Sequence, residues 1–327
     1  MKKLSIKISF FLLGLIILIF FFGQFDNIDK FRNTNPNVAR ITNATRFDSL
    51  DILFIGSSAS YSGINPVFFD SLGLRTYNLG IAAAGPYFYE LLVNDYLAAV
   101  KQKPKSVFLL MLPTTFMDQI DNFEEIGIHR YLNKPISNET IAKKYSSWSS
   151  YPNLLIKSFQ KGAKNLIFRD KLSEENALTE INGKGFYPSK ETSSSTKELQ
   201  EFSFYSGWIK QKFHFNKFEY LIHYAKSLEE QGIVVVFYFV PCNKASSFFN
   251  KQFLKDFTNV LSATRKTSLI LDGTPINLID SLDYRNSDHL NSNGASKVSK
   301  TIANEIVNTP KLKYLFGLSD TYSQLNK

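Results

Sequence analysis

The sequence has little cysteine and histidine. Cys242 is the single cysteine among 327 residues, so an internal disulfide cannot form and a zinc site built on cysteines is excluded. Only four histidines are present, and no His/Asp cluster has the spacing of metal ligands. No glycine-rich loop ends in Lys followed by Ser or Thr, which excludes a phosphate-binding loop of that type. We therefore expect no metal ion and no other cofactor.

The sequence also lacks a concentrated basic run, although its formal net charge is +9. The lysines are scattered along the chain and are not interleaved with aromatic residues, as nucleic-acid-binding modules require. We therefore expect no nucleic-acid partner and a solvated basic surface. Affinity for anionic polymers or lipid head groups is the alternative interpretation. Nothing in the sequence identifies a protein partner.

One long apolar run lies near the amino terminus. Lys2, Lys3 and Lys7 precede residues 8–22, which are uncharged and almost wholly apolar. This length lies between a signal-peptide core and a full membrane span, and no small-x-small cleavage site follows. We predict an uncleaved signal anchor over residues 1–25, with a cleaved signal peptide as the alternative. The lysines would stay in the cytoplasm, which predicts a single-pass membrane protein with an extracytoplasmic body.

Strand-like apolar runs alternate with helical patterns in two parts of the chain. Their apolar character on both faces is typical of parallel strands covered by helices, so the alternation predicts a doubly wound α/β fold of three layers. The expected strands are residues 51–55, 76–80, 106–112, 233–240 and 268–271, and the expected helices are residues 86–100, 218–231, 254–264 and 295–307.

Residues 114–215 interrupt this alternation with a stretch rich in Ser, Lys and Asn. About 100 residues is too long for a plain connection, so we predict a mainly helical cap insertion above the sheet edge. Aromatic residues such as Phe186 and Tyr187, and others at 202–205, would line a substrate cleft there. A connection without a functional role is the alternative. The predicted divisions are a signal anchor at 1–25, a juxtamembrane linker at 26–50, an α/β domain at 51–113 and 216–310, the cap at 114–215, and a carboxyl-terminal tail at 311–327.

A candidate nucleophile follows the first expected strand. The apolar run 52–55 ends in Gly56 and two serines, which places the hydroxyl of Ser58 at the carboxyl edge of the sheet. Open α/β sheets bind their ligands at that edge. A serine hydroxyl needs a neighbouring base to become a good nucleophile. His289 lies in a polar loop after the last strand, whereas the other three histidines lie in the insertion or near helices with aromatic neighbours. The sequence predicts a Ser58–His289 pair.

These segments resemble the SGNH/GDSL hydrolases, and most closely their membrane-anchored bacterial members. The resemblance covers roughly residues 51–113 and 218–307. It is carried by Gly56-Ser-Ser58, Gly63, Asn78-Leu-Gly80 and Asp288-His-Leu-Asn-Ser-Asn-Gly-Ala295. It implies a flavodoxin-like sheet and an esterase, lipase, or carbohydrate O-acyl hydrolase or transferase. It further implies that Ser58 is the nucleophile, that His289 is the base, and that the backbone N–H groups of Ser58 and Gly80 form the oxyanion hole.

The sequence departs from the family pattern in three blocks. Ser57 stands where the first block usually has Asp, at a position outside the catalytic triad. The Asn of the third block has no clear match, and Thr114 or Thr115 is its weak substitute. The catalytic Asp is expected three residues before His289, where Asn286 stands instead. An asparagine can orient the imidazole but cannot stabilise the imidazolium by charge.

Other carboxylates compete for the role of the missing acid. Asp288 is adjacent to His289, and neighbours on an extended segment point apart, so it is not expected to reach the ring. Asp283 and Asp272 are candidates from nearby loops. The Ser58–His289 site would then be slow, work as a dyad, or be inactive.

Two hypotheses of function follow. In the first, the protein is an extracytoplasmic serine esterase or O-acyltransferase that acts on acyl groups of cell-envelope or exported polysaccharide, or on a small ester. In the second, it is a catalytically weak or inactive domain that binds glycan or assists a cell-envelope assembly complex. A purely structural anchor would explain neither of the two terminal motifs.

Overall fold

The computed structural model describes part of the chain. The described residues are 2–25, 40–41, 43–82, 84–116, 184–188, 215–241, 254–262, 268–273, 276–286 and 289–319. The chain divides into two compact units, one made of residues 1–39 and 123–178 and the other of residues 40–122 and 179–327. Helix α1 (Lys2–Phe25) is the described part of the first unit. The second unit contains the sheet and is described below by itself.

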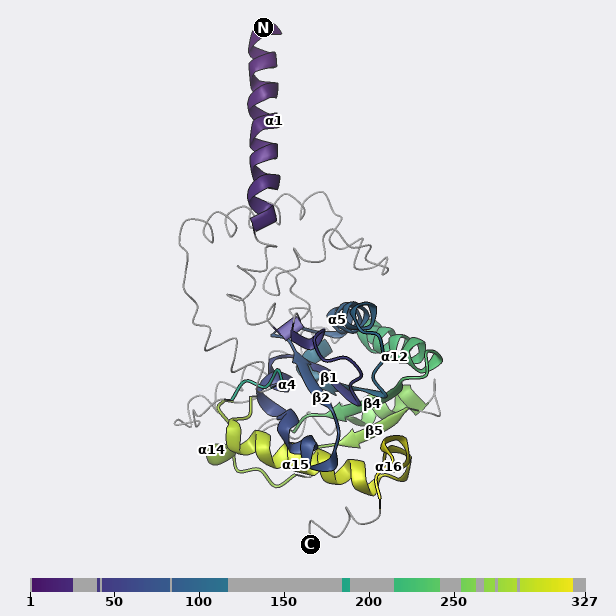
Figure 1. The fold of residues 1–327 in the computed structure, drawn as a ribbon. Coiled ribbons are helices and arrows are strands. Elements are labelled where there is room, and N and C mark those ends of the chain that lie inside the picture. Colours follow the sequence, from purple (N-terminus) through teal and green to yellow (C-terminus); the bar gives the residue numbers. More distant parts are fainter. Residues whose placement is uncertain are drawn as a thin grey trace. The chain divides into compact units, whose positions relative to one another are not determined.

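The second unit is built on a five-stranded sheet in which all strands are parallel (Figure 1). The spatial order is β2-β1-β3-β4-β5, which is the order of flavodoxin-like doubly wound sheets. The predicted mixed α/β fold with a parallel sheet is therefore confirmed. The strands are β1 (Ile52–Gly56), β2 (Thr76–Gly80), β3 (Ser106–Met111), β4 (Val234–Phe239) and β5 (Leu269–Asp272).

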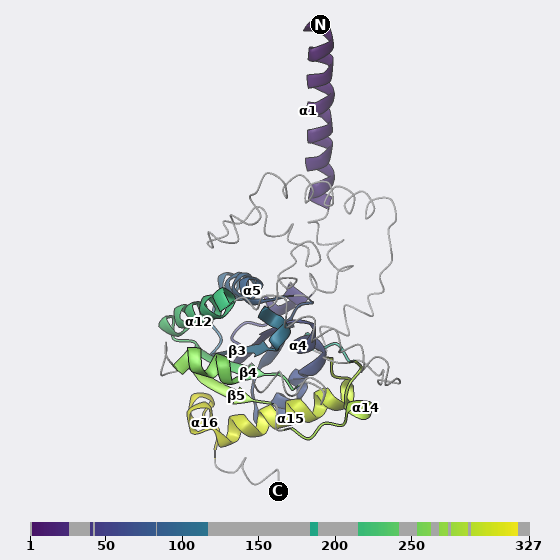
Figure 2. The same ribbon diagram turned by 180° about the vertical axis from the view of Figure 1, so that it is seen from behind.

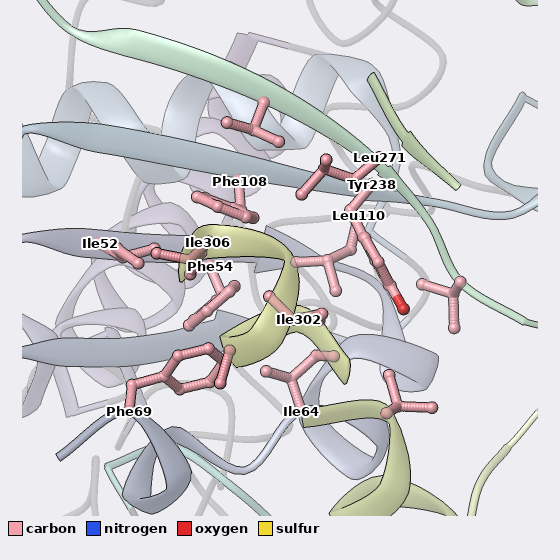
Figure 3. Close-up of a cluster of buried hydrophobic side chains, with 14 of the residues drawn as sticks. Ile52, Phe54, Ile64, Phe69, Phe108, Leu110, Tyr238, Leu271, Ile302 and Ile306 are labelled. Atoms are coloured by element: carbon pink, nitrogen blue, oxygen red, sulfur yellow. The ribbon is translucent and has the colours of Figure 1, made fainter. Parts of the chain in front are cut away.

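One face of the sheet packs against four short or amphipathic elements. Alternate strand residues, among them Phe54, Phe108 and Leu110, form a buried cluster with Ile302 and Ile306 (Figure 3). Such a cluster provides most of the stabilisation because burial of a large apolar side chain contributes about 1.5–3 kcal/mol. The elements on this face are α4 (Ser58–Gly63), η1 (Pro66–Leu72), α15 (Ser292–Asn308) and α16 (Pro310–Phe316).

The opposite face is covered by α5 (Pro86–Ala99) and α12 (Phe215–Glu230), which lie side by side in both views (Figures 1 and 2). The ring of Phe257 packs there against Phe218, Phe237 and Phe239, with ring centroids 5.1–5.4 Å apart. Together with the first face this gives three layers. The strands are apolar on both faces because both faces are covered.

The prediction for the amino terminus is only partly met. Residues Lys2–Phe25 do form helix α1. However, none of the helices that the structure describes has both the length and the apolar character needed to cross a membrane. The transmembrane helix predicted over residues 1–25 is therefore not supported.

Most of the predicted cap insertion, residues 114–215, lies outside the described residues. This applies to the helical pattern and to the aromatic residues at 202–205. The described parts are the single turn η2 (Pro113–Phe116), residues 184–188, and the first residue of α12. The division of the chain into anchor, linker, body, cap and tail stays a prediction.

Candidate active site

Ser58 lies on a tight turn between β1 and α4. Ser57 is the residue before the helix, and Ser58 is its first residue. A Cβ added to Gly56 would lie 2.5 Å from the Cβ of Ser60, so only glycine lets the helix pack this closely on the strand end. The same holds for Gly80 at the end of β2, where an added Cβ would lie 2.6 Å from the Tyr61 nitrogen. These two glycines allow the serine to stand directly above the carboxyl ends of the strands.

His289 lies in a narrow loop between α14 (Asp280–Asp283) and α15. Tyr284 and Leu290 form an antiparallel bridge, and the Arg285 N–H donates to the His289 carbonyl at 2.8 Å. The chain therefore reverses within a few residues and brings Asn286 against His289. Helix α15 begins immediately after the loop, with Asn291 as its cap, since the Asn291 side chain accepts from the N–H groups of residues 293 and 294.

Ser58 and His289 are in hydrogen-bond contact. The Ser58 Oγ and the His289 Nε2 lie 2.7 Å apart, although 231 residues separate them in the sequence. Both side chains are partly buried. A distance of 2.7 Å is within the reach required for proton transfer between a hydroxyl and an imidazole.

Asn286 holds the imidazole from the other side with one oxygen atom. Its Oδ1 lies 2.9 Å from the His289 Nδ1 and accepts from the His289 backbone N–H at 3.0 Å. The backbone N–H can only donate, so the amide must present its oxygen and not its nitrogen. That oxygen in turn requires Nδ1 to carry the proton. The Nε2 lone pair is then directed at Ser58, which is the tautomer that a general base needs.

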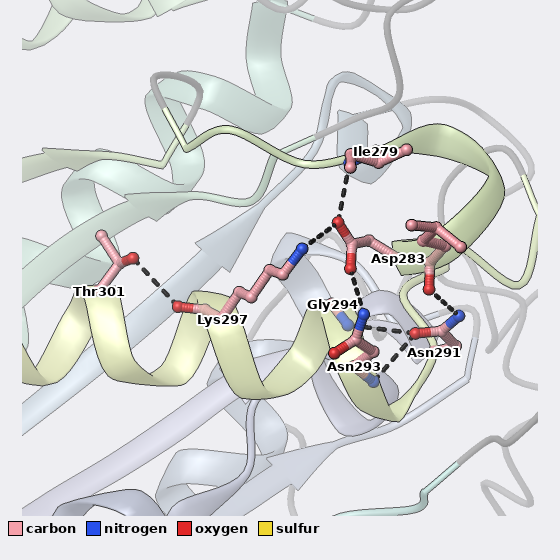
Figure 4. A network of polar contacts seen from close by, with 8 residues as sticks. Ile279, Asp283, Asn291, Asn293, Gly294, Lys297 and Thr301 are labelled. Atoms are coloured by element: carbon pink, nitrogen blue, oxygen red, sulfur yellow. Dashed lines mark hydrogen bonds and ion pairs between the residues drawn. The ribbon is translucent and has the colours of Figure 1, made fainter.

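The Asp283 carboxylate belongs to a network of structural hydrogen bonds and is not the group that holds the imidazole (Figure 4). Its carboxylate is fully buried; it accepts from Lys297 Nζ at 2.7 Å, from Asn293 Nδ2 at 2.7 Å and from the Ile279 N–H at 2.8 Å. These bonds tie the loop that carries His289 to the first turns of α15. Asp283 is therefore not the acid partner of His289.

The two other carboxylates considered as partners of His289 are Asp288 and Asp272. Asp288, one of the predicted site residues, lies outside the described residues. Asp272 is the last residue of β5, and its side chain is exposed. Among the described residues, the group seen against the His289 Nδ1 is the amide of Asn286. Also among the described residues, no group of three or more His, Cys, Asp or Glu side chains has a metal-binding arrangement.

Gly80, the predicted second oxyanion donor, already has a partner for its N–H. It donates to Asn78 Oδ1 at 3.0 Å. The fully buried Asn78 also accepts from the Ser60 hydroxyl at 3.2 Å and donates from Nδ2 to the carbonyls of Ser60 and Ile64, at 2.8 and 2.7 Å. Asn78 thus fixes the middle and the carboxyl-terminal end of α4 to β2. This role was not predicted from the sequence, although a polar residue inside an apolar strand is a signal for it.

The two threonines that were candidates for the third block lie in the turn after β3. The Thr115 Oγ1 accepts from the Leu112 N–H at 3.0 Å, and the Thr115 N–H donates back to the Leu112 carbonyl. Thr115 is almost fully buried by this arrangement, and Thr114 is 8% exposed. Thr115 therefore closes a turn, and no contact between either threonine and the Ser58–His289 pair is seen among the described residues.

Tyr238, on β4, has a buried hydroxyl on the face of the sheet that α4 and α15 cover. Burial raises the pKa of its phenol well above the ordinary value of 10.0, because the charged form would lose its hydration. The phenol therefore stays neutral and does not serve as a base.

Besides the Ser58–His289 contact, a second hydrogen bond joins the segment that carries the nucleophile to the segment that carries the histidine. The Asn65 N–H donates to Ser299 Oγ at 2.8 Å, and the same hydroxyl donates to the Ala295 carbonyl at 2.7 Å. Asn65 follows α4, and Ser299 is a fully buried residue of α15. The two segments that carry Ser58 and His289 are thus fixed against each other close to the site.

Comparisons with known proteins show limited similarity. No protein-family model matches the chain. The "Pseudaminic acid cytidylyltransferase and UDP-2,4-diacetamido-2,4,6-trideoxy-beta-L-altropyranose hydrolase" of Helicobacter pylori is 37% identical over 121 residues, which is 37% of this chain and 19% of that protein. Among solved structures, the acetyl xylan esterase Est2A from the rumen bacterium Butyrivibrio proteoclasticus has a TM-score of 0.34 at 9% identity, over 81% of this chain and 65% of that chain. At these levels neither match assigns a family.

Proposed function

We propose that the protein is a serine esterase or O-acyltransferase of the SGNH type that acts on acyl groups of a carbohydrate. One observation carries the proposal: the Ser58 Oγ lies 2.7 Å from the His289 Nε2, while Asn286 holds the opposite side of the ring. A hydroxyl, a correctly oriented imidazole and a third group behind it are the parts of a nucleophilic acyl-transfer site.

The chemistry proceeds through an acyl-enzyme. Ser58 Oγ attacks the ester carbonyl carbon while its proton passes to His289 Nε2. The tetrahedral intermediate then expels the alcohol, which takes that proton from the imidazolium. Water or a second alcohol, activated by the same imidazole, attacks the acyl-serine and releases the acid or the transferred ester. Hydrolysis and transfer differ only in this last acceptor.

Charge stabilisation in this site relies on few groups. The Ser58 N–H, on the first residue of α4, is the proposed donor to the developing oxyanion. The Gly80 N–H contributes only if the Asn78 Oδ1 releases it. Asn286 orients the imidazole but adds no negative charge opposite the imidazolium. We therefore propose an enzyme that is slower than one with a complete Ser–His–Asp triad.

Asn286 also favours a second candidate function. A site whose imidazole is oriented by a neutral amide can persist as a binding site for the acylated glycan after turnover is lost. In that case the protein binds carbohydrate, or assists an assembly complex of the cell envelope, and does not cleave esters.

A fluorophosphonate probe separates the two functions, because it reacts covalently only with an activated serine. We expect the full-length protein to be labelled, the Ser58→Ala variant to lose the label, and the neighbouring Ser57→Ala variant to keep it. Ser57 is a matched control because its side chain makes no capping bond to α4. Absence of labelling in the parent protein would favour the binding function.

The location of the site outside the cytoplasm stays a prediction from the sequence of residues 1–25. It has a direct test, since a cysteine introduced at Asn37 should react with a membrane-impermeant maleimide in intact spheroplasts. Labelling only after lysis would place the body of the protein in the cytoplasm.

A further inference from the structure

A short segment from far along the chain packs beside the nucleophile helix. The Asn78 N–H donates to the Lys184 carbonyl at 2.9 Å, and the Tyr187 N–H donates to the Tyr61 carbonyl at 2.9 Å. Residues 184–188 therefore pair with the free edge of β2 and with α4 (Figure 1). Two backbone bonds fix the position of this segment on elements that the sheet already holds.

The segment brings a second tyrosine ring against Tyr61. The rings of Tyr61 and Tyr187 are perpendicular, with centroids 6.2 Å apart. Arg40 lies against the pair, with its Cζ 4.2 Å from the Tyr61 centroid and 6.0 Å from the Tyr187 centroid. Arg40 is 2% exposed and donates from Nε to the Gly185 carbonyl at 3.3 Å. The guanidinium thus supports the rings from the protein side.

The two neighbouring aromatic residues of the segment differ in exposure. Phe186 is 7% exposed and belongs to the core, whereas Tyr187 keeps 48% of its surface exposed. Tyr187 therefore presents part of its aromatic side chain to solvent, next to the covered Phe186.

This surface lies close to the nucleophile. Ser58 and Tyr61 both belong to α4, three residues apart. Residues at that spacing are neighbours on a helix surface, with Cβ atoms about 5–6 Å apart. Tyr61 is therefore a neighbour of the residue whose hydroxyl would attack the ester, and the Tyr187 ring lies next to it, with the two ring centroids 6.2 Å apart.

We propose that Tyr61 and Tyr187 form a subsite for the sugar ring that carries the acyl group. This inference rests on the proposed function and names its substrate class. The C–H face of a pyranose packs on an aromatic ring, and the two phenol hydroxyls can bond to its hydroxyl groups. Tyrosine supplies such amphipathic contact at low entropic cost because it has two side-chain torsions. An open, perpendicular pair suits a sugar ring better than an acyl chain, which needs an enclosed apolar channel.

Binding is measured first, independently of turnover, in the full-length Ser58→Ala protein. The probes are O-acetylated xylotetraose and O-acetylated cellotetraose, and the readout is saturation-transfer NMR with a titration for affinity. We expect Tyr187→Ala to weaken binding at least five-fold, with transfer to the sugar C–H protons lost. Tyr314→Ala is the matched control, because Tyr314 is 90% exposed on α16. Unchanged affinity in Tyr187→Ala, or an equal loss in Tyr314→Ala, overturns the subsite.

Turnover is the second measurement, with the native serine in place. Tyr187→Ala should lower kcat/KM at least five-fold more for the acetylated tetraoses than for 4-nitrophenyl acetate, which has no sugar. For the acetylated tetraoses the same variant should raise KM at least five-fold with little change in kcat. A parallel loss on both substrates would mean that Tyr187 supports the fold of the site and binds no sugar. If the parent fails to turn over either substrate while Tyr187-dependent sugar binding persists, the esterase fails and the subsite stands.

Discussion

One oxygen of Asn286 accepts both the backbone N–H and the ring Nδ1–H of His289. This double contact matters because an asparagine behind a catalytic histidine can otherwise turn its amide nitrogen toward the ring. In a serine protease the change from Asp to Asn costs about 10⁴ in turnover, chiefly through the wrong tautomer. Here the backbone N–H holds the amide in one orientation, so the tautomer is correct although the amide itself carries no charge.

The first prediction concerns Asn286. We expect Asn286→Asp to raise kcat/KM for 4-nitrophenyl acetate at least several-fold, because a carboxylate stabilises the imidazolium that forms during attack. Asn286→Ala should lower it, because the imidazole loses its orientation. Asp288→Asn is the comparison variant and should have little effect. Loss of activity in Asp288→Asn, with no change in Asn286→Asp, would make Asp288 the working acid.

The second prediction concerns Asn78, whose side chain makes four hydrogen bonds: two to Ser60 of α4, one to Ile64 just after that helix, and one to the Gly80 N–H of its own strand. Each buried partner left unsatisfied costs about 1–3 kcal/mol. We expect Asn78→Ala to lower the free energy of unfolding by more than 2 kcal/mol, and Asn78→Asp to lower it at least as much. The aspartate would place an oxygen against the Ser60 and Ile64 carbonyls.

Urea denaturation followed by circular dichroism measures the effect of the Asn78 substitutions. Asn308→Ala is the control, because Asn308 is an exposed residue at the end of α15. An Asn78→Ala protein as stable as this control would show that the four bonds contribute nothing net.

The third prediction concerns Ser299, whose hydroxyl joins α15 to the segment after α4. Ser299→Ala leaves the Asn65 N–H without its acceptor, so we expect a loss of about 1–3 kcal/mol in thermal or urea unfolding. Ser296→Ala removes a hydroxyl of the same helix whose hydrogen bond, among the described residues, goes to the Ser292 carbonyl one turn earlier. It should change stability by less than about 0.5 kcal/mol. Equal effects of the two substitutions would contradict a specific link between the segments.

The fourth prediction separates structure from catalysis at Asp283. Asp283→Asn removes the charge opposite Lys297. The carboxylate is fully buried but the Lys297 side chain is 39% exposed, so we expect a cost below the roughly 3–5 kcal/mol of breaking a fully buried pair. We expect a clear fall in stability but an esterase activity within a few-fold of the parent at a temperature where both proteins are folded. An activity loss of 10³-fold or more in folded Asp283→Asn would assign the carboxylate to the catalytic site.

Much of the fold was predictable because its signals are local. The strand expected at 76–80 is β2 itself, and that expected at 233–240 is β4 with one more residue at each end. Asn65 directly before Pro66 is the residue pattern of a helix start, and the Asn65 side chain accepts from the Val67 N–H at the start of the 3₁₀ helix η1. Apolar runs, caps and turn residues act over a few neighbours, so the sequence displays them directly.

The candidate site was predictable in part for a different reason. Carboxyl ends of parallel strands meet at one edge, so a serine after the first strand and a histidine after the last were expected to converge there. The sequence by itself determined this placement, the parallel sheet and the absence of a disulfide. Only the tertiary structure decided which oxygen faces the imidazole, that Asp283 pairs with Lys297, that Asn78 takes the Gly80 N–H, and that Tyr187 lies on Tyr61. Which groups pair in such contacts depends on atomic positions in the folded chain to within a few tenths of an ångström. No pattern of neighbouring residues in the sequence specifies these positions.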